Sequence, residues 1–502
     1  MNQSVTKPQS PKTANPKRKK LLGFSLLGLL VLALIAGLVF ALINNTQQDS
    51  VDTGVASSSL TGDAKTLTVG ADGVEITSGG IYQLDTNIDS GCVIVRAAEA
   101  DVQLILKGVS ITNPDGPAIY VEAADNFYLV LEGENTLTAT TTTDYNGAIY
   151  AKDDILISGD GSLNITSNID GIVGKDDLQI DGGTFVINAE DDGIVGKDSI
   201  KITGGDLTIN AGGQGLKTSN DLEKGDAEIT GGSIKIVSEG DGIHVIANLL
   251  VSGGHITIES GDDGIHADGT ITINDGTVDI AKSYEGIEGG TITVNGGDVK
   301  IVATDDGFNA AGGSDTSSTK QDNFVSDTSK NLTINGGTVY VNAGGDGLDS
   351  NGNIYITGGT TYVDGPTNSG NGAIDYGDAG CEFKITGGTL IAVGSAGMAV
   401  NATSATQATV LINLTSTYSG SLSFGDISYT PAKSYASVLI SSDKLSLGQS
   451  YSLSINGTGV QSVTLNNYVT TSGAAGMQPG MGQGQQGQQG QGRQQMGGGA
   501  RR

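Results

Sequence analysis

Residues 176–197 read DDLQIDGGTFVINAEDDGIVGK, and residues 198–216 repeat the pattern as DSIKITGGDLTINAGGQGL. Both segments contain a Gly-Gly pair, and the second glycine of this turn recurs at positions 183, 205, 232, 254, 276, 297, 337, 359 and 388, with Asp275 in place of the first glycine at one of them. The steps between these positions are 22, 27, 22, 22, 21, 40, 22 and 29 residues. A period of about 22 residues with occasional longer steps is typical of a solenoid, in which each repeat packs on its neighbours.

Each repeat contains three short segments whose residues indicate β-strands. Apolar and polar residues alternate in the first two, as in Leu178/Ile180 and Leu207/Ile209, and the third is an acid-Gly-apolar step such as Asp192-Gly193-Ile194. Period-two alternation buries one face of a strand, and apolar spacings of three or four, which a helix would need, do not recur. The sequence therefore predicts an all-β fold, a parallel β-helix of about 22 residues per coil, over residues 65–400.

The remaining segments differ in composition from the repeat. Residues 401–470 lose the period but keep the alternation, which predicts a C-terminal β cap over the end of the core. Residues 471–502 are rich in Gly and Gln and lack a core-forming pattern, so a disordered tail is expected. Insertions at Thr218–Asp226 and Ala310–Lys330 leave the same corner of the coil, either as walls of a binding surface or as plain surface loops.

The N-terminal segment has the pattern of a membrane anchor. Residues 21–43 carry no charge and are long enough as a helix to cross a bilayer. Basic residues in 1–20 predict that this segment is cytoplasmic, with residues 44–64 as a flexible linker and the β-helix outside the cell. The sequence thus predicts a single-pass protein of the cell membrane. The alternative is a cleaved signal peptide, which would normally have a shorter apolar region and a small-residue cleavage site.

The net charge of the chain limits the kinds of molecule that it can bind. The chain has 26 basic and 55 acidic residues, and nine of the basic residues lie near the termini, in segments 7–20 and 493–502. The part between them has 17 basic residues against 55 acidic ones, a net charge of −38. Such a surface repels nucleic acid and anionic lipid and favours divalent cations, so no nucleic-acid partner is expected.

The acid before the repeat glycine recurs at one position of the coil. Stacking would bring these carboxylates to about 5 Å from one another, a spacing at which calcium can be held by several oxygens. Because Asp-Gly is also a common turn dipeptide, turn chemistry is the competing explanation. The candidate calcium ligands are Asp262, Asp263, Glu285, Glu288, Asp305, Asp306, Asp346, Asp349 and Asp375.

Other side chains are candidates for contact with a ligand. Tyr340 and Tyr355 are expected to point outward on late coils, either as a sugar-stacking strip or as cover for the sheet, and Lys282 lies near the acidic cluster. A basic row is predicted at Lys175, Lys197 and Lys217. His244 and His266 fall at equivalent positions of successive coils, which favours an outward surface ladder over a transition-metal site.

Several stretches resemble a known family. They are LILKGVSITN (104–113), GPAIYV (116–121), AIYAKDD (148–154) and the repeated DDGI units followed by KD. Over residues 65–470 the chain resembles the clostridial and lactic-type cell-surface carbohydrate-binding proteins of Gram-positive bacteria, whose right-handed β-helix is related to that of pectate lyases. The resemblance implies a right-handed helix, binding to cellulose-like or pectin-like polysaccharide, and calcium on the acidic coil faces.

Three functions remain open on the sequence. The first is a membrane-anchored, non-catalytic protein that binds plant-type or cell-wall polysaccharide. The second is a calcium-dependent polysaccharide lyase, which needs a Lys or Arg base beside the metal, with Lys282 as the available candidate. The third is a β-helical adhesin that would bind through the insertion at Ala310–Lys330. The repetition of the lysines argues for a structural or substrate-lining row, and so against an enzyme.

Overall fold

The computed structural model describes residues 59–220, 224–311, 326–378 and 380–473. The chain divides into two units, Met1–Asp52 and Thr53–Arg502, and all of the described residues lie in the second. Within these ranges, no helix has the length and apolar character needed to span a membrane. The cytoplasmic segment 1–20, the anchor 21–43, most of the linker 44–64 and nearly all of the tail 471–502 lie outside the described residues.

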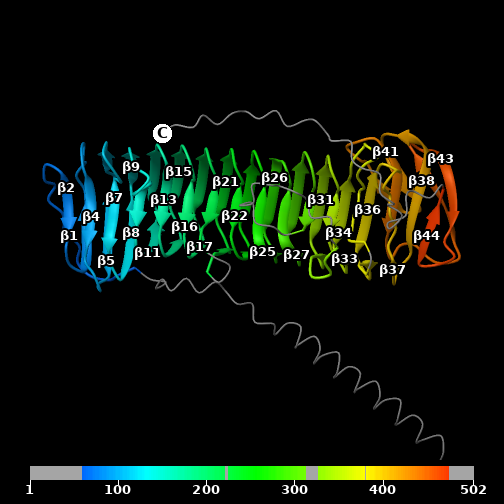
Figure 1. The fold of residues 1–502 in the computed structure, drawn as a ribbon, viewed down its shortest axis with the longest axis horizontal. Coiled ribbons are helices and arrows are strands. Elements are labelled where there is room, and N and C mark those ends of the chain that lie inside the picture. The colour runs from blue at the N-terminus through cyan, green and yellow to red at the C-terminus, as the bar shows by residue number, and fades with distance from the viewer. Residues whose placement is uncertain (1–58, 221–223, 312–325, 379, 474–502) are drawn as a thin grey trace, which may run out of the picture. The chain divides into compact units, whose positions relative to one another are not determined.

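Strands of successive coils stack side by side along the solenoid (Figure 1), and their pairings define three rows. The first row contains β2 (Gly73–Ile76), β4 (Cys92–Arg96), β7 (Ile119–Ala123), β10 (Gly147–Ala151), β13 (Asp170–Gly174), β16 (Ile194–Gly196), β19 (Leu216–Thr218), β22 (Ile243–Val245), β25 (Ile265–Ile273), β27 (Ile287–Val294), β29 (Phe308–Ala310) and β32 (Leu348–Ser350). Strands β25 and β27 are long enough to continue into the second row.

The second row contains β1 (Lys65–Thr66), β3 (Gly80–Leu84), β5 (Val102–Lys107), β8 (Asn126–Glu132), β11 (Asp154–Gly159), β14 (Asp177–Ile180), β17 (Ser199–Ile202), β20 (Asp226–Ile229), β23 (Leu249–Val251), β30 (Asn331–Ile334), β33 (Asn353–Ile356), β35 (Phe383–Ile385) and β37 (Ser404–Ala405). The third row contains β6 (Ser110–Asn113), β9 (Glu134–Ala139), β12 (Ser162–Ser167), β15 (Thr184–Ala189), β18 (Asp206–Ala211), β21 (Ser233–Ser238), β24 (His255–Glu259), β26 (Thr277–Ser283), β28 (Asp298–Ala303), β31 (Thr338–Ala343), β34 (Thr360–Asp364) and β36 (Thr389–Gly394).

The strands of each row pair in parallel with the register that the glycine spacing predicts. In the third row, Phe185 pairs with Leu207, Leu207 with Ile234 and Ile234 with Ile256, at offsets of 22, 27 and 22 residues. Later pairs follow the longer steps, including the 40-residue step from Val299 to Val339. The prediction of an all-β solenoid of parallel strands with a 22-residue period is therefore confirmed.

The core is a column of apolar side chains inside the coils. Alternate residues of every row are fully buried, and Ile187, Ile209 and Ile236 are successive members of one such column. Burial of one Ile or Leu side chain contributes roughly 1.5–3 kcal/mol. Backbone N–H and C=O groups are satisfied from coil to coil, as in the bond from Thr184 N to Gly161 O.

The glycine of each acid-Gly-apolar step is required by space. A Cβ atom on Gly264 would lie 2.6 Å from Gly286 O of the next coil and 2.7 Å from Ile280 Cδ1 of the core. The turn glycines have a different reason, since Gly183 has a φ of +101°. The Gly-rich composition is therefore a packing requirement of the stacked coils as well as a turn requirement.

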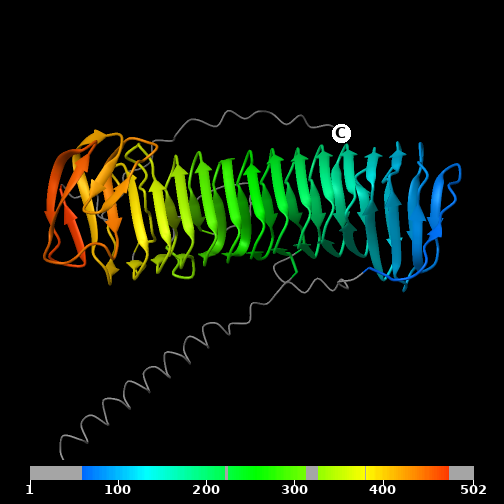
Figure 2. The same cartoon turned by 180° about the vertical axis from the view of Figure 1, so that it is seen from behind.

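A β cap follows the last coils. Within residues 401–470 and just beyond, the structure has β38 (Thr409–Tyr418), β39 (Leu422–Phe424), β40 (Ile427–Tyr429), β41 (Tyr435–Ser441), β42 (Ser450–Ile455), β43 (Thr458–Thr464) and β44 (Val469–Ser472). Strand β41 pairs antiparallel with both β36 and β38, so the cap extends the third row, and β39, β40, β42 and β43 form a separate sheet. The cap encloses its own apolar cluster at the end opposite β1 (Figure 2).

We predict that Gly264→Ala destabilises the protein by about 1–3 kcal/mol, because the added methyl group must push apart two coils. Gly459→Ala is the control, since Gly459 is exposed in the cap and its nearest foreign atom to a Cβ would be Ser452 Oγ at 3.3 Å. Urea denaturation followed by far-ultraviolet circular dichroism measures both variants. Equal stability of the two would contradict this account of the glycines.

Candidate functional site

The outward residues at the centre of the first row form one continuous ladder along the solenoid, here called the outer ladder. Its chemistry changes along the axis, from aromatic and apolar residues in the early coils, through basic residues, to acidic residues in the late coils. In order, its members are Tyr120, Tyr150, Val173, Val195, Lys217, His244, His266, Glu288, Asn309, Asp349 and Asp375.

The acids of the acid-Gly-apolar steps, here called the turn acids, flank this ladder. In the aspartates among them, one carboxylate oxygen accepts a backbone N–H from the next coil. Asp170 Oδ1 accepts from Asp192 N at 3.1 Å, and Asp241 Oδ1 accepts from Asp263 N at 3.0 Å. Turn chemistry therefore accounts for one oxygen of each of these acids.

The second oxygen of several turn acids faces the basic part of the outer ladder. Lys217 Nζ lies 2.7 Å from Asp192 Oδ2, and His244 Nδ1 lies 2.8 Å from Asp241 Oδ2. A turn acid thus has a structural oxygen and an oxygen that is directed at the ladder.

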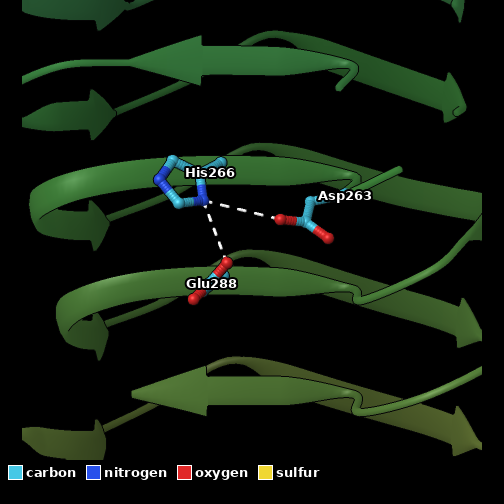
Figure 3. A group of neighbouring side chains, drawn as sticks. All are labelled: Asp263, His266 and Glu288. Carbon is cyan, nitrogen blue, oxygen red and sulfur yellow. Dashed lines mark hydrogen bonds and ion pairs between the residues drawn. The ribbon is translucent and has the colours of Figure 1, made fainter. Parts of the chain in front are cut away.

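His266 is the centre of the most enclosed charged group on this face (Figure 3). Its Nδ1 lies 3.0 Å from Glu288 Oε2 and 3.5 Å from Asp263 Oδ2, and its Nε2 lies 3.1 Å from Asp268 Oδ1. The ring also stacks on His244, with centroids 5.0 Å apart and planes 7° apart. The predicted histidine ladder exists, but its expected exposure is wrong, because the His266 side chain is only 1% exposed.

The three carboxylates decide the protonation of this imidazole. Desolvation alone would lower the pKa of His266, but hydrogen bonds to Asp263, Asp268 and Glu288 raise it well above its usual value. Burial raises the pKa of Asp263 to about 7, against the lowering effect of His266. The group is therefore an imidazolium held between carboxylates, and it explains how like charges on Asp263 and Glu288 are tolerated.

We predict that His266→Gln costs about 3 kcal/mol of stability at pH 7, because the change leaves buried carboxylates without their cation. His255→Gln is the matched control, since His255 is exposed on β24 and its loss should cost less than about 0.5 kcal/mol. Chemical denaturation at pH 7 compares the two variants. Equal losses of stability in the two variants would contradict a stabilising ion pair between His266 and the carboxylates around it.

The late coils bring together most of the acids that were predicted as calcium ligands. Glu288, Asp349 and Asp375 lie on the outer ladder, and Glu285, Asp306 and Asp346 are the turn acids beside them. Burial, followed by neighbouring carboxylates, raises the pKa of Glu285 to about 10 and that of Asp346 to about 7. The same causes raise the pKa of Asp349 well above its usual value.

Asn309 lies between Glu288 and Asp349 on the outer ladder. Its Nδ2 donates to Glu285 Oε2 at 3.0 Å, so its amide oxygen points away from that carboxylate. This Oδ1 is buried and has no hydrogen-bond partner among the described residues. An unpaired buried acceptor costs about 1–3 kcal/mol, and an amide oxygen is a ligand that calcium accepts.

The other predicted metal residues are more dispersed. Asp262 and Asp305 precede the turn acids and are partly exposed. In the described ranges, the groups of three whose ligand atoms all lie within 4.8 Å of one another are Asp263/His266/Glu288, Asp154/Asp176/Asp177 and Asp170/Asp191/Asp192. The first of these groups contains two of the predicted calcium ligands, Asp263 and Glu288. Its third member is His266, which was predicted to lie in an outward surface ladder.

The predicted sugar-contact residues lie on different faces. Tyr340 is on β31 in the third row, where its hydroxyl donates to Asp364 Oδ2 at 3.1 Å. Tyr355 is on β33 in the second row, and Lys282 is exposed on β26 in the third. The expectation of one strip made by Tyr340 and Tyr355 is therefore wrong, since alternation places both outward but on separate sheets.

An aromatic group in the early coils was missed. Tyr120 and Tyr150 are neighbours on the outer ladder, and Tyr145 joins them from the loop between β9 and β10, with ring centroids 5.1 Å and 5.6 Å away. The signal was present in the matching AIY triplets at 118–120 and 148–150. Tyr145 lies in a loop outside the repeat, so its placement carried no comparable signal.

The basic row also needs correction. The register pairs Gly174 with Gly196 and Ala151 with Gly174, so the residues that follow them, Lys152, Lys175 and Lys197, form the row. Lys217 pairs with Val195 and belongs to the outer ladder instead. The lysine row therefore runs beside the tyrosines and starts one coil earlier than predicted.

Comparison with known proteins gives three matches. Residues 71–307 match the model of a family described as "Carbohydrate-binding domain-containing protein". A curated protein of the same description from Acetivibrio thermocellus is 31% identical over 133 residues, which are 24% of this chain and 46% of that protein. The chain is also similar to the solved polysaccharide lyase-like protein from C. thermocellum, a gadolinium derivative, at 29% identity and a TM-score of 0.38, covering 42% of this chain and 91% of the other.

The match to the family model and the curated relative confirm the resemblance to a carbohydrate-binding family for residues 71–307. This chain spans about half the length of the curated relative that it matches. The matched segment includes the outer ladder from Tyr120 to Glu288, and it ends before Asn309 and Asp349.

Proposed function

We propose that this protein is a membrane-anchored, extracellular, non-catalytic polysaccharide-binding protein that holds its ligand on the outer ladder. The family match over residues 71–307 supports a carbohydrate as the ligand. The apolar run 21–43 and the basic residues before it support a single-pass anchor with the coils outside the cell, wound right-handed as in the family it resembles. A plant-type or cell-wall glycan, cellulose-like or pectin-like, is the expected partner.

We propose further that calcium binds at the acidic end of the outer ladder. The observation that carries this proposal is the unpaired Asn309 Oδ1 between the carboxylates of Glu288 and Asp349. These are hard oxygen donors on successive coils, and the turn acids Glu285 and Asp346 add further negative charge. Calcium bound there would neutralise the carboxylates and offer its remaining coordination positions to sugar oxygens.

A cation also resolves the repulsion between protein and ligand. The chain has a net charge of −29, so an acidic glycan cannot approach the acidic ladder without a counter-ion. Lys282, which the lyase hypothesis needs as a base, is exposed in the third row, whereas the acids lie on the first. Lys282 therefore lies on a different face from the proposed metal ligands, so its position does not support a lyase. Polysaccharide binding is the function that the geometry favours.

We predict that Asp349→Asn raises the melting temperature in chelator at pH 8 by about 2 °C. Because burial raises the pKa of Asp349, its ionised form is disfavoured in the folded protein. The wild-type protein therefore loses stability as pH rises above the unfolded-state pKa near 3.9. The gain should therefore vanish at pH 4. In millimolar calcium the order should reverse, because the wild-type protein gains stability by binding the ion and the variant gains less.

The control for this experiment is Asp298→Asn, which removes an exposed acid from β28. It should leave the melting temperature within error under all of these conditions. An unchanged melting temperature of the wild-type protein between chelator and calcium would refute the metal site.

We predict that calcium increases retention on insoluble polygalacturonate at least tenfold, and that the double variant Asp346→Asn, Asp349→Asn loses this increase. Asp206→Asn, Asp298→Asn is the matched control, since it removes two exposed acids of the third row with the same change in net charge. A pull-down assay with and without chelator measures both variants. Equal retention by the two double variants in calcium would place the ligand elsewhere on the surface.

A further inference from the structure

We infer that the early coils carry a second, calcium-independent sugar site, in which Tyr120 and Tyr145 stack on a sugar ring while Lys152 and Lys175 pair with carboxylates of an acidic glycan. This inference rests on the proposed function, because it assigns a ligand class to the opposite end of the same ladder. Of these four residues, only Lys175 was predicted from the sequence, as part of a basic row that is either structural or substrate-lining.

The aromatic part of the site is built on a rigid support. Tyr145 is 40% exposed, and its ring lies 5.1 Å from that of the half-buried Tyr120. Below them Tyr150 is 6% exposed and packs in one cluster with Val173 and Val195, the next two members of the outer ladder. The support holds the exposed rings in place, so little side-chain entropy remains to be lost on binding.

The polar part of the site is the lysine row along one edge of the tyrosines. Lys152 Nζ lies 5.5 Å from the centroid of the Tyr120 ring, and Lys175 Nζ lies 5.4 Å from that of Tyr150. Lys197 continues the row in the next coil. Contact with a ring face orients an ammonium group. Lys152 also has a side-chain hydrogen bond to Tyr120, but an ammonium group has three donors, so each lysine can still receive a carboxylate.

The chemistry of this arrangement selects a uronic-acid glycan. A sugar ring has an apolar C–H face that packs on an aromatic ring, and a uronate adds a carboxylate at its edge. Successive lysines are one coil apart, about 4.8 Å, so carboxylates along a glycan chain can meet successive ammonium groups. A neutral glycan would use the rings but leave the partly buried Lys175 without a new partner.

The test measures binding of a soluble oligogalacturonate to the full chain by calorimetry, in mild detergent and excess chelator. A second ligand is the same oligosaccharide with its carboxyl groups methyl-esterified. The variants are Tyr145→Ala, Tyr145→Phe and the double variant Lys152→Gln, Lys175→Gln. The controls are Tyr468→Ala, whose tyrosine is 49% exposed in the cap, and Lys235→Gln, whose lysine is exposed on β21.

We expect the wild-type protein to bind the oligogalacturonate in chelator and to bind the methyl ester at least tenfold more weakly. Tyr145→Ala should lose about tenfold in affinity and the lysine double variant about fivefold, while Tyr145→Phe and both controls keep the wild-type value. The lysine variant should also show a smaller dependence on salt, because two charge contacts are gone.

Two outcomes would overturn the inference. One is affinity in chelator that does not change in Tyr145→Ala and in the lysine double variant. The other is binding that appears only with calcium, which would leave the proposed function standing and remove this site. Absence of binding to either ligand, with and without calcium, would reject the proposed function together with the inference.

Discussion

The stacking of each coil on the next is the constraint on which every other feature depends. Backbone N–H groups of one coil donate to carbonyl oxygens of its neighbour, as Ile194 N does to Gly215 O, and this bond fixes the register. Once the register is fixed, each side chain lies directly on the side chain at the same position of the adjacent coil. For the core this is favourable, because Ile on Ile fills space well, and it explains the buried columns of the three rows.

On the outer face the same constraint creates an electrostatic problem, since a repeated acid must lie on another acid. The structure shows two solutions, and the proposed function adds a third. In the early coils the ladder is Tyr and Val, which carry no charge. In the middle coils, Lys217, His244 and His266 follow one another on the ladder and pair with carboxylates beside it, which raise the pKa of the buried His266 imidazole. In the late coils the carboxylates have raised pKa values, and a calcium ion is the counter-charge that we propose for them.

The sequence predicts the period and the register because both depend on the spacing of glycines that no other residue can replace. It also grouped Glu288, Asp349 and Asp375 in one acidic cluster of the late coils, and the register places Asn309 between Glu288 and Asp349. Alternation places Tyr340 and Tyr355 outward, and their positions after Gly337 and before Gly359 already assign them to different strands of the repeat, so the expectation of one strip overlooked this signal. His266 is covered by Asp268 of its own coil and by Glu288 of the next coil, which both contact its ring. The repeat pattern gives no information on these contacts, so the burial of His266 could not be predicted from the sequence.

The two oxygens of a turn acid explain why one motif can serve both folding and binding. Asp346 Oδ1 accepts the backbone N–H of Gly372, which is a bond that an asparagine can also make at this position. The negative charge of Asp346 is thus separable from its role in the turn, and Asn is the substitution that removes one while retaining the other. An alanine here would lose both, and its effect on binding could not be distinguished from damage to the coil. Where the repeat has Asp-Gly, the step therefore forms a turn, and its charge acquires a separate role only where the outer ladder beside it provides a partner.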